Sequence, residues 1–243
     1  MTTVLITGAN RGLGLALAQL YAADRADVIV CCRDPENADA LKQLAASSGG
    51  RVQIIQLDVT DLTSIASLKD ALGDRPIDIL INNAGINGTP KVQSADCIDA
   101  EGWINTLRIN ALSPVLIAQA LRDNLRRSSE KKLVAISSDL GSTGVDYGAT
   151  SAVRSERYAY RASKAALNNG MRGLARDWAA DGVVVGILNP GFVRTDMTGA
   201  RGAASSASIS AEESARGLIR QIAGLTRANS GTFWDYRGET IAW

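Results

Sequence analysis

Short apolar runs rich in β-branched residues recur along the chain, and longer amphipathic stretches separate them. Most of these runs are apolar throughout rather than alternating, which is typical of strands covered on both faces of a sheet. The predicted strands lie at 4–7, 28–32, 52–58, 77–85, 132–138, 183–191 and 231–236. Segments such as LGLALAQLYAADR and DLTSIASLKDAL have helical length between them. The pattern predicts an α/β fold, with helices on both faces of a parallel sheet of about seven strands.

No internal repeat or long linker interrupts this alternation, so we expect a single domain over residues 1–243. Two stretches depart from it, at 141–156 and 198–210, and both consist mainly of small and polar residues with several glycines. Each follows a strand end, which is where open α/β sheets carry their sites. Loops of this length are usually lids or disordered segments, and we interpret these two as lids.

Composition and charge restrict the classes of partner. The chain is 46% apolar and 21% charged, with a formal net charge of +1, so it has no bulk electrostatic attraction to nucleic acid or an acidic membrane. No apolar run is long enough to span a bilayer, and the N-terminal sequence lacks the pattern of a signal peptide. Three cysteines without a CxxC pair, and no histidine, argue against structural zinc and fit a reducing compartment. We expect a cytoplasmic protein without a metal, membrane or nucleic-acid partner.

A glycine-rich segment, TGANRGLG at 7–14, follows the first predicted strand and opens the first predicted helix. Gly8 would allow a tight turn, Gly12 would let the backbone approach a pyrophosphate, and Gly14 would permit close helix packing. The helix N-terminus would present unpaired amides to the phosphates. The spacing is G-x-x-x-G-x-G, and a plain turn is the alternative, but its position favours a dinucleotide site.

The end of the second predicted strand bears on which nicotinamide cofactor would bind. A carboxylate at that position would bind the ribose hydroxyls of NAD, but Cys32 occupies it and Arg33 follows. Arg11 lies in the glycine turn, and two guanidinium groups suit a ribose 2′-phosphate. We therefore predict NADP(H) rather than NAD(H), although Asp34 could turn inward.

Asp58 closes the third predicted strand. Its carboxylate could accept a hydrogen bond from the adenine amino group, while Val59 supplies a backbone amide. Alternatively Asp58 caps the next helix, a role that Asp61 could fill equally well.

The segment YAYRASKAALN at 158–168 offers acid–base chemistry in a chain without histidine. Tyr160 and Lys164 are four residues apart and share a helix face, whereas Tyr158 points elsewhere. A nearby ammonium favours phenolate, so we predict that Lys164 lowers the pKa of Tyr160 from the ordinary value of about 10. Alternatively, both residues belong to an ordinary helix surface, where the apolar parts of their side chains cover the edge of the core.

Several motifs together resemble the short-chain dehydrogenase/reductase family. These are TGANRGLG, NNAG at 82–85, Asn110, Ser138, YRASK at 160–164 and PGFVRT at 190–195. They occur in the family's order over nearly the full length. The longer insert before the tyrosine and the ending SGTFWDYRGETIAW resemble the C-factor and sniffer group, which are relatives of carbonyl reductases.

This resemblance implies a Rossmann-type sheet and NADP(H)-dependent carbonyl reduction or alcohol oxidation. The implied catalytic set is Asn110, Ser138, Tyr160 and Lys164, with Ser138 chosen over Ser137 because it satisfies Ser-x-x-Gly. Tyr160 would exchange the substrate proton, Ser138 would donate to the substrate oxygen, and Asn110 would join Lys164 through water. The implied cofactor contacts are Gly8, Asn10, Arg11, Gly12, Leu13, Gly14, Arg33, Asp58, Val59, Asn82, Ala84, Gly85, Tyr160, Lys164, Pro190, Gly191, Val193 and Thr195. Asn83 is interpreted as a structural brace.

The substrate side follows the family less closely, because the spacing from Ser138 to Tyr160 is long and the last strand is atypical. Phe192, Tyr147 and Met197 suggest a small, hydrophobic ketone or aldehyde. Trp243 is expected to anchor against a neighbouring surface, either a lid or a second subunit of a dimer or tetramer. The alternative function is an NAD(P)H-binding signalling or sensor protein with little turnover.

Overall fold

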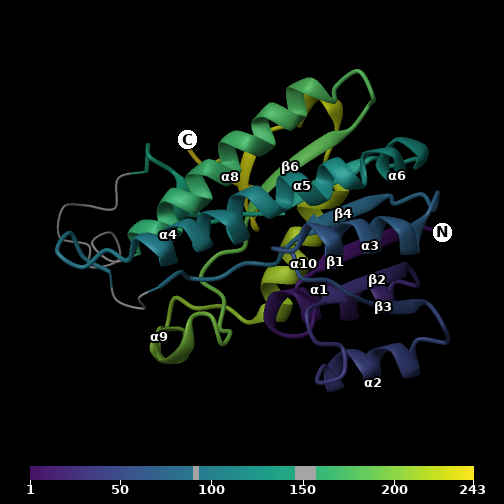
Figure 1. Cartoon of the computed structure of the whole chain (residues 1–243), viewed down its shortest axis with the longest axis horizontal. Coiled ribbons are helices and arrows are strands. Elements are labelled where there is room, and N and C mark those ends of the chain that lie inside the picture. Colours follow the sequence, from purple (N-terminus) through teal and green to yellow (C-terminus); the bar gives the residue numbers. More distant parts are fainter. Residues whose placement is uncertain (90–92, 146–156) are drawn as a thin grey trace.

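A computed structural model describes residues 1–89, 93–145 and 157–243, and it contains a seven-stranded sheet. The strand order is β3-β2-β1-β4-β5-β6-β7, and every neighbouring pair is parallel (Figure 1). The strands are β1 (Thr3–Thr7), β2 (Asp27–Cys32), β3 (Val52–Gln56), β4 (Ile79–Asn82), β5 (Lys132–Ile136), β6 (Val184–Asn189) and β7 (Phe233–Asp235). The predicted Rossmann-type sheet is confirmed.

Helices cover both faces of this sheet. One face is covered by α1 (Gly12–Ala23), α2 (Asp39–Ser47) and α10 (Ala211–Ala223), and the other by α3 (Leu62–Leu72), α5 (Ser113–Ala120) and α8 (Tyr158–Asp177) (Figure 1). Side chains of β1 alternate between the two cores, with Val4 and Ile6 in one and Leu5 in the other. Because both faces are buried, the strands are apolar throughout, as the sequence pattern predicts.

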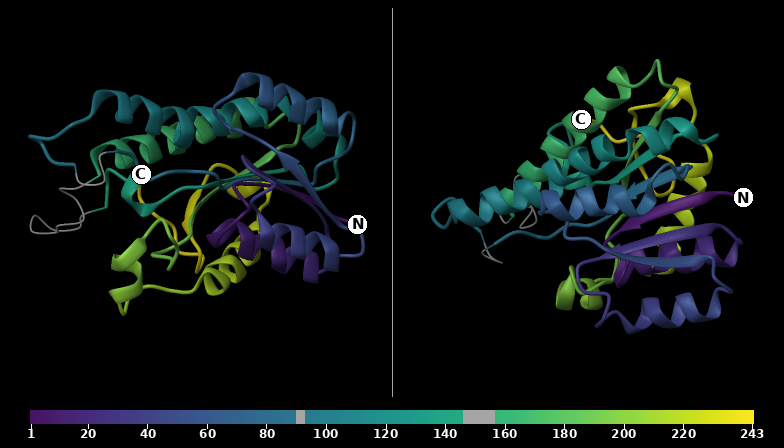
Figure 2. Two further views of the ribbon diagram at one scale, coloured as in Figure 1. Left: turned by 60° about the horizontal axis from the view of Figure 1, so that its bottom comes forward. Right: turned by 45° about the vertical axis from the view of Figure 1, so that its right-hand side comes forward.

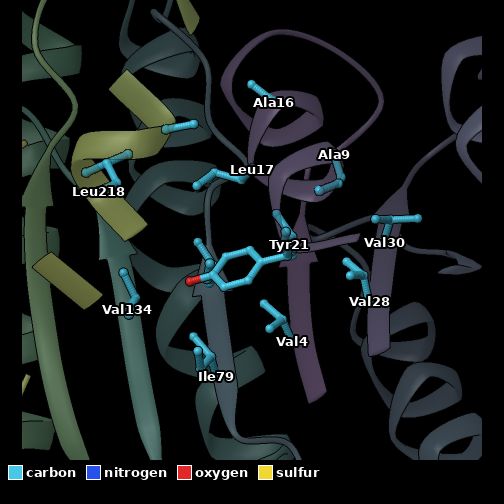
Figure 3. Packing of buried hydrophobic residues seen from close by; sticks show 14 of the residues in the cluster. Val4, Ala9, Ala16, Leu17, Tyr21, Val28, Val30, Ile79, Val134 and Leu218 are labelled. Atoms are coloured by element: carbon cyan, nitrogen blue, oxygen red, sulfur yellow. The ribbon is translucent and has the colours of Figure 1, made fainter. Parts of the chain in front are cut away.

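Tyr21 places its hydroxyl group in the apolar core under α1. Figure 3 shows the ring of Tyr21 among Val4, Ile79 and Val134. Its hydroxyl is buried and makes no hydrogen bond to any residue that the structure describes. Burial raises the pKa of Tyr21 well above its ordinary value, with Asp24 and Glu130 adding to the shift. The hydroxyl therefore costs the fold free energy rather than stabilising it.

Shorter elements complete the fold. They are α4 (Ala100–Leu107), a π-helical turn η1 (Arg108–Leu112), α6 (Arg122–Arg127), η2 (Asp139–Gly141), α9 (Gly199–Ala204) and η3 (Arg227–Asn229). In Figures 1 and 2, α4 and α9 lie on the side of the molecule opposite the N-terminus, beyond the carboxyl ends of the strands. Within the described residues, no helix is long and apolar enough to cross a membrane.

The two stretches interpreted as lids have different outcomes. Most of 141–156 lies outside the described residues, which resume at Arg157. The stretch 198–210 contains α9. After this helix, Ile209 forms a parallel bridge with Val193. Residues 83–85, predicted as strand, leave the sheet after Asn82 and enter the region beyond the strand ends.

Candidate active site

A cavity of about 630 Å³ opens at the carboxyl ends of the strands. Its wall comes from the glycine turn, the ends of β2 to β6, and the first two turns of α8. Every predicted catalytic or cofactor-contacting residue lines it except Asn82 and Asn110. Residues that are far apart in the chain thus meet at the edge where parallel sheets carry ligands.

The glycine turn forms one wall through close backbone contacts. Gly8 and Gly12 have φ of 66° and 56°, which L side chains rarely adopt. A Cβ on Gly8 would lie 2.9 Å from the Cα of Ala84, and one on Gly12 would lie 3.2 Å from the Cγ2 of Thr195. A Cβ on Gly14 would lie 2.5 Å from the Nδ2 of Asn83. These glycines leave a cradle at the N-terminus of α1 that fits a dinucleotide pyrophosphate.

Asn83 fixes the shape of this turn. Its Nδ2 donates to the carbonyls of Thr7 at 2.9 Å and Gly8 at 3.0 Å. The backbone amides of Asn83 and Ala84 both donate to the Thr7 hydroxyl, at 3.0 and 3.1 Å. Asn83 therefore acts as the structural brace that the sequence suggests. Asn82 is buried, donates to the Pro114 carbonyl at 3.3 Å and is not among the residues that line the cavity.

Basic residues stand at the adenosine end of the cavity. Arg33 and Cys32 line it beside β2. Arg11 also lines it, but its Nη1 pairs with Asp196 Oδ2 at 3.0 Å, with the two side chains 69% and 72% exposed. Asp34 does not line the cavity; it accepts hydrogen bonds from the backbone and side-chain amides of Asn37.

The two aspartates after β3 have separate places. Asp61 is the N-cap of α3 and accepts from the Thr63 amide at 2.9 Å. Asp58 lines the cavity and accepts from the amide and hydroxyl of Thr60, at 2.8 and 2.7 Å. These hydrogen bonds hold the pKa of Asp58 below its ordinary value, the Thr60 hydroxyl having the largest effect. Because Asp61 caps the helix, Asp58 remains an ionised acceptor at the cavity wall.

Tyr160, Lys164 and Ser138 converge at the other end of the cavity. Tyr160 and Lys164 are 8% and 5% exposed, and the Lys164 Nζ lies 5.7 Å from the centroid of the tyrosine ring. That ammonium donates to the Ile136 carbonyl at 2.8 Å. Ser138 lies two residues after the end of β5 and hydrogen-bonds the Tyr160 side chain. The predicted pair therefore faces the cavity rather than forming ordinary helix surface.

The predicted effect of the lysine on the tyrosine is wrong in this structure. Burial raises the pKa of Tyr160 above its ordinary value and outweighs the lowering by Ser138 and Arg157, while Asp139 adds to the rise. Burial also lowers the pKa of Lys164, to about 8. Desolvation disfavours the charged form of both groups, so it opposes a phenolate–ammonium pair.

Asn110 lies in the π-helical turn, just behind the cavity wall. Its Oδ1 accepts from the Ile86 amide at 2.9 Å, and its Nδ2 donates to the Ile86 carbonyl at 2.8 Å and the Ser163 hydroxyl at 3.0 Å. A Cβ on Gly85 would lie 3.2 Å from Asn110 Oδ1 and 3.9 Å from Lys164 Nζ. Asn110 thus holds residues 85–86 beside the lysine, and both N–H donors of its side-chain amide are used, one for Ile86 and one for Ser163.

The substrate side has residues that the sequence motifs missed. Phe192 and Met197 line the cavity as expected, while Tyr147 lies outside the described residues. Asp139 and Arg157 also line it, and neither belongs to a motif. Only the adjacency of Asp139 to Ser138 could have indicated it from the sequence. Among the described residues, no group of three or more His, Cys, Asp or Glu could hold a metal ion.

Comparison with known proteins assigns the family. A family model described as short chain dehydrogenase matches residues 2–206. The C-signal protein of Myxococcus xanthus is 37% identical over 170 residues, which cover 69% of this chain and 93% of that protein. The NADPH-bound carbonyl reductase from chicken fatty liver superposes with a TM-score of 0.89 and 30% identity, covering 100% of this chain and 99% of that one. The carbonyl reductase Sniffer of D. melanogaster has a TM-score of 0.87 and 29% identity, and both chains are fully covered. The chain therefore belongs to the short-chain dehydrogenase family of oxidoreductases, in the group that contains C-signal and Sniffer.

Proposed function

We propose that this protein reduces small ketones or aldehydes with NADPH, or oxidises the corresponding alcohols with NADP. The observation that carries the proposal is the convergence of Tyr160, Lys164 and Ser138 in one cavity with the glycine cradle. A site that only binds the cofactor needs the glycine cradle, but it does not need the hydroxyl groups of Tyr160 and Ser138 beside the ammonium of Lys164. The bound nicotinamide would supply or accept the hydride, and the protein's residues would manage the proton and the charge.

Tyr160 acts as the general acid in the reduction direction. Its raised pKa means that the hydroxyl keeps its proton at neutral pH, as a proton donor to a carbonyl oxygen must. Ser138 donates a second hydrogen bond to the same oxygen as negative charge develops there. Lys164 has one N–H committed to the Ile136 carbonyl, which leaves two donors for the cofactor's nicotinamide ribose and the proton path. Asn110 positions the 85–86 segment beside that lysine.

NADP(H) is the proposed cofactor because Cys32 stands where an NAD site would carry a carboxylate, and Arg33 follows it at the adenosine end of the cavity. Arg33 is the main candidate for the 2′-phosphate, since Arg11 is partly engaged by Asp196. Arg33→Gln should weaken NADPH binding roughly tenfold or more while leaving NADH binding almost unchanged. Arg216→Gln, an exposed arginine on α10 paired with Glu212, is the matched control. Equal losses for NADPH and NADH would contradict this preference.

The function is tested by following NADPH oxidation over a panel of aliphatic and aromatic aldehydes and ketones. Turnover should depend on the carbonyl compound and be much faster with NADPH than with NADH. The control is the same protein and NADPH without a carbonyl compound. Binding of NADPH with no turnover over the whole panel would refute the proposal.

A second candidate is a cofactor-binding signalling protein with little turnover, and the 37% identity to C-signal favours it. The same panel separates the two, because a sensor would bind NADP(H) tightly and reduce nothing. We also propose that the protein acts in the cytoplasm and that its partner is a small carbonyl compound.

A further inference from the structure

Residues 240–243 fold back along the last strand and end beside the active site. After β7 the chain turns at Asp235, whose Oδ1 accepts from the amides of Arg237 and Glu239 at 2.9 and 3.0 Å. The returning segment pairs antiparallel with β7, because Thr240 bridges to Trp234 and the Ile241 amide donates to the Phe233 carbonyl at 2.8 Å. Trp243 therefore has a defined place against the sheet edge.

The ring of Trp243 is held by two residues from different elements. The guanidinium of Arg172, on α8, lies 4.3 Å from the ring centroid, and the ring of Phe233 lies 5.7 Å away at an angle of 32°. A cation over an aromatic face and an aromatic pair each contribute roughly 0.5–1.5 kcal/mol. These contacts hold the ring although Trp243 is 37% exposed.

The main-chain oxygen of Trp243 holds the segment that follows Ser138. It accepts from the Gly144 amide at 2.6 Å and from the Thr143 hydroxyl at 3.3 Å. The approach is close, because a Cβ on Gly144 would lie 2.7 Å from that oxygen. The tryptophan thus clamps residues 143–144 from outside the cavity.

The segment between this clamp and the proposed catalytic groups is short and hydrogen-bonded. Ser138 is the N-cap of η2, and the Ser142 amide donates to the Asp139 carbonyl at 2.9 Å. A Cβ on Gly141 would lie 2.8 Å from the backbone carbon of Lys164, so η2 packs directly on α8. One end of the 138–144 segment therefore carries Ser138, its middle rests on Lys164, and its far end is held by Trp243.

We propose that Trp243 is a positioning residue for the active site, which holds the 138–144 segment, and with it Ser138, against α8. The inference rests on the proposed function and adds a residue that touches neither cofactor nor substrate. Trp243→Ala should lower kcat/KM for a carbonyl substrate roughly tenfold to a hundredfold, since small displacements of positioned groups have effects of that size. The affinity for NADPH, which depends on the distant glycine cradle, should not change.

Three variants distinguish positioning from a merely structural role. Trp243→Phe keeps a ring over Arg172 and should restore most of the activity. Gly144→Ala adds a Cβ against the main-chain oxygen of Trp243 and should cause the same loss of activity. In the double variant, the two losses should not add. Gly173→Ala is the control, because a Cβ there would meet no atom within 4 Å.

Hydrogen exchange gives a readout that does not depend on turnover. Backbone amides in peptides covering 139–145 should exchange faster in Trp243→Ala and Gly144→Ala than in the wild type and Gly173→Ala, at temperatures well below unfolding. If the wild type reduces no carbonyl compound, the proposed function fails while exchange still tests the clamp. Unchanged exchange in the two variants, or kcat/KM falling only in proportion to NADPH affinity, would overturn the positioning role.

Discussion

The two ends of the cavity are built in different ways. At the cofactor end, the glycine turn packs closely on main-chain atoms: a Cβ on Gly8 would lie 2.9 Å from the Ala84 Cα, and one on Gly14 would lie 2.4 Å from the Gly8 carbonyl oxygen. At the substrate end, main-chain hydrogen bonds tie Phe192 and Arg194 to Ile209. Two side-chain contacts add to these, the exposed Arg11–Asp196 pair and Asn87 Nδ2 to the Met197 carbonyl. Phe192 and Met197 remain partly open to solvent.

This difference indicates how binding and chemistry are divided. Under the proposed function, cofactor affinity should depend on main-chain shape that a single added methyl group disturbs. Proton transfer and substrate choice should depend on a few side chains mounted on that frame. Substitutions at the two ends should therefore separate cofactor affinity and stability from turnover.

The largest expected effect is at the substrate end. Tyr160→Phe removes the proton donor while keeping the ring, so turnover of a carbonyl substrate should fall by roughly 10²–10⁴-fold. The dissociation constant for NADPH and the melting temperature should stay near the wild-type values. Steady-state rates, fluorescence titration with NADPH and thermal unfolding measure the three quantities. A variant with wild-type turnover would remove Tyr160 from the mechanism.

The matching change at the cofactor end is Gly14→Ala. The new Cβ would lie 2.5 Å from Asn83 Nδ2, so the brace of the glycine turn must shift. We expect a loss of about 1–3 kcal/mol in the free energy of unfolding. NADPH affinity should fall together with it, by roughly tenfold or more. Gly173→Ala, which adds the same methyl group in open space, should leave both almost unchanged or raise stability slightly. A normal affinity in Gly14→Ala would contradict the backbone-built cradle.

A pH profile sharpens the electrostatics of the substrate end. Burial lowers the pKa of Lys164 to about 8, so its positive charge is present below that pH and is lost as the pH rises through it. If the charge supports catalysis, kcat/KM for carbonyl reduction should fall above about pH 8, approaching tenfold per pH unit. Tyr160, whose pKa is raised, stays protonated over this range and is not the cause.

Lys164→Arg provides the control for this profile, because a guanidinium stays charged throughout. The fall above pH 8 should then disappear, even if the absolute rate is lower. A wild-type profile that stays level to pH 10, or an identical fall in the variant, would assign the pH dependence to another group.

The smallest expected effect lies in the core below the cofactor end. Tyr21→Phe removes a buried hydroxyl that has no partner among the described residues. The free energy of unfolding should rise by about 1 kcal/mol, because the desolvation cost disappears and the ring contacts remain. Denaturant unfolding measures this, and NADPH affinity should not change. A loss of stability would mean that the hydroxyl has a partner after all.

The sequence by itself determined the parts of this protein that depend on local spacing. Apolar runs of strand length predicted a sheet buried on both faces. The glycines at 8, 12 and 14 predicted the cradle, and the four-residue spacing of Tyr160 and Lys164 placed them on one helix face. These inferences hold because strand and helix periodicities fix which side chains point the same way, whatever the rest of the chain does.

Only the tertiary structure decided what depends on burial and on contacts between distant segments. It reversed the predicted pKa shift of Tyr160, because desolvation by surrounding residues exceeds the effect of a lysine one helical turn away. It divided the two asparagines, with Asn83 bracing the turn and Asn82 facing Pro114. It brought Trp243 to Gly144, which lies 99 residues earlier in the chain. No local pattern encodes such outcomes, since they follow from which surfaces lose water and meet when the sheet and its helices assemble.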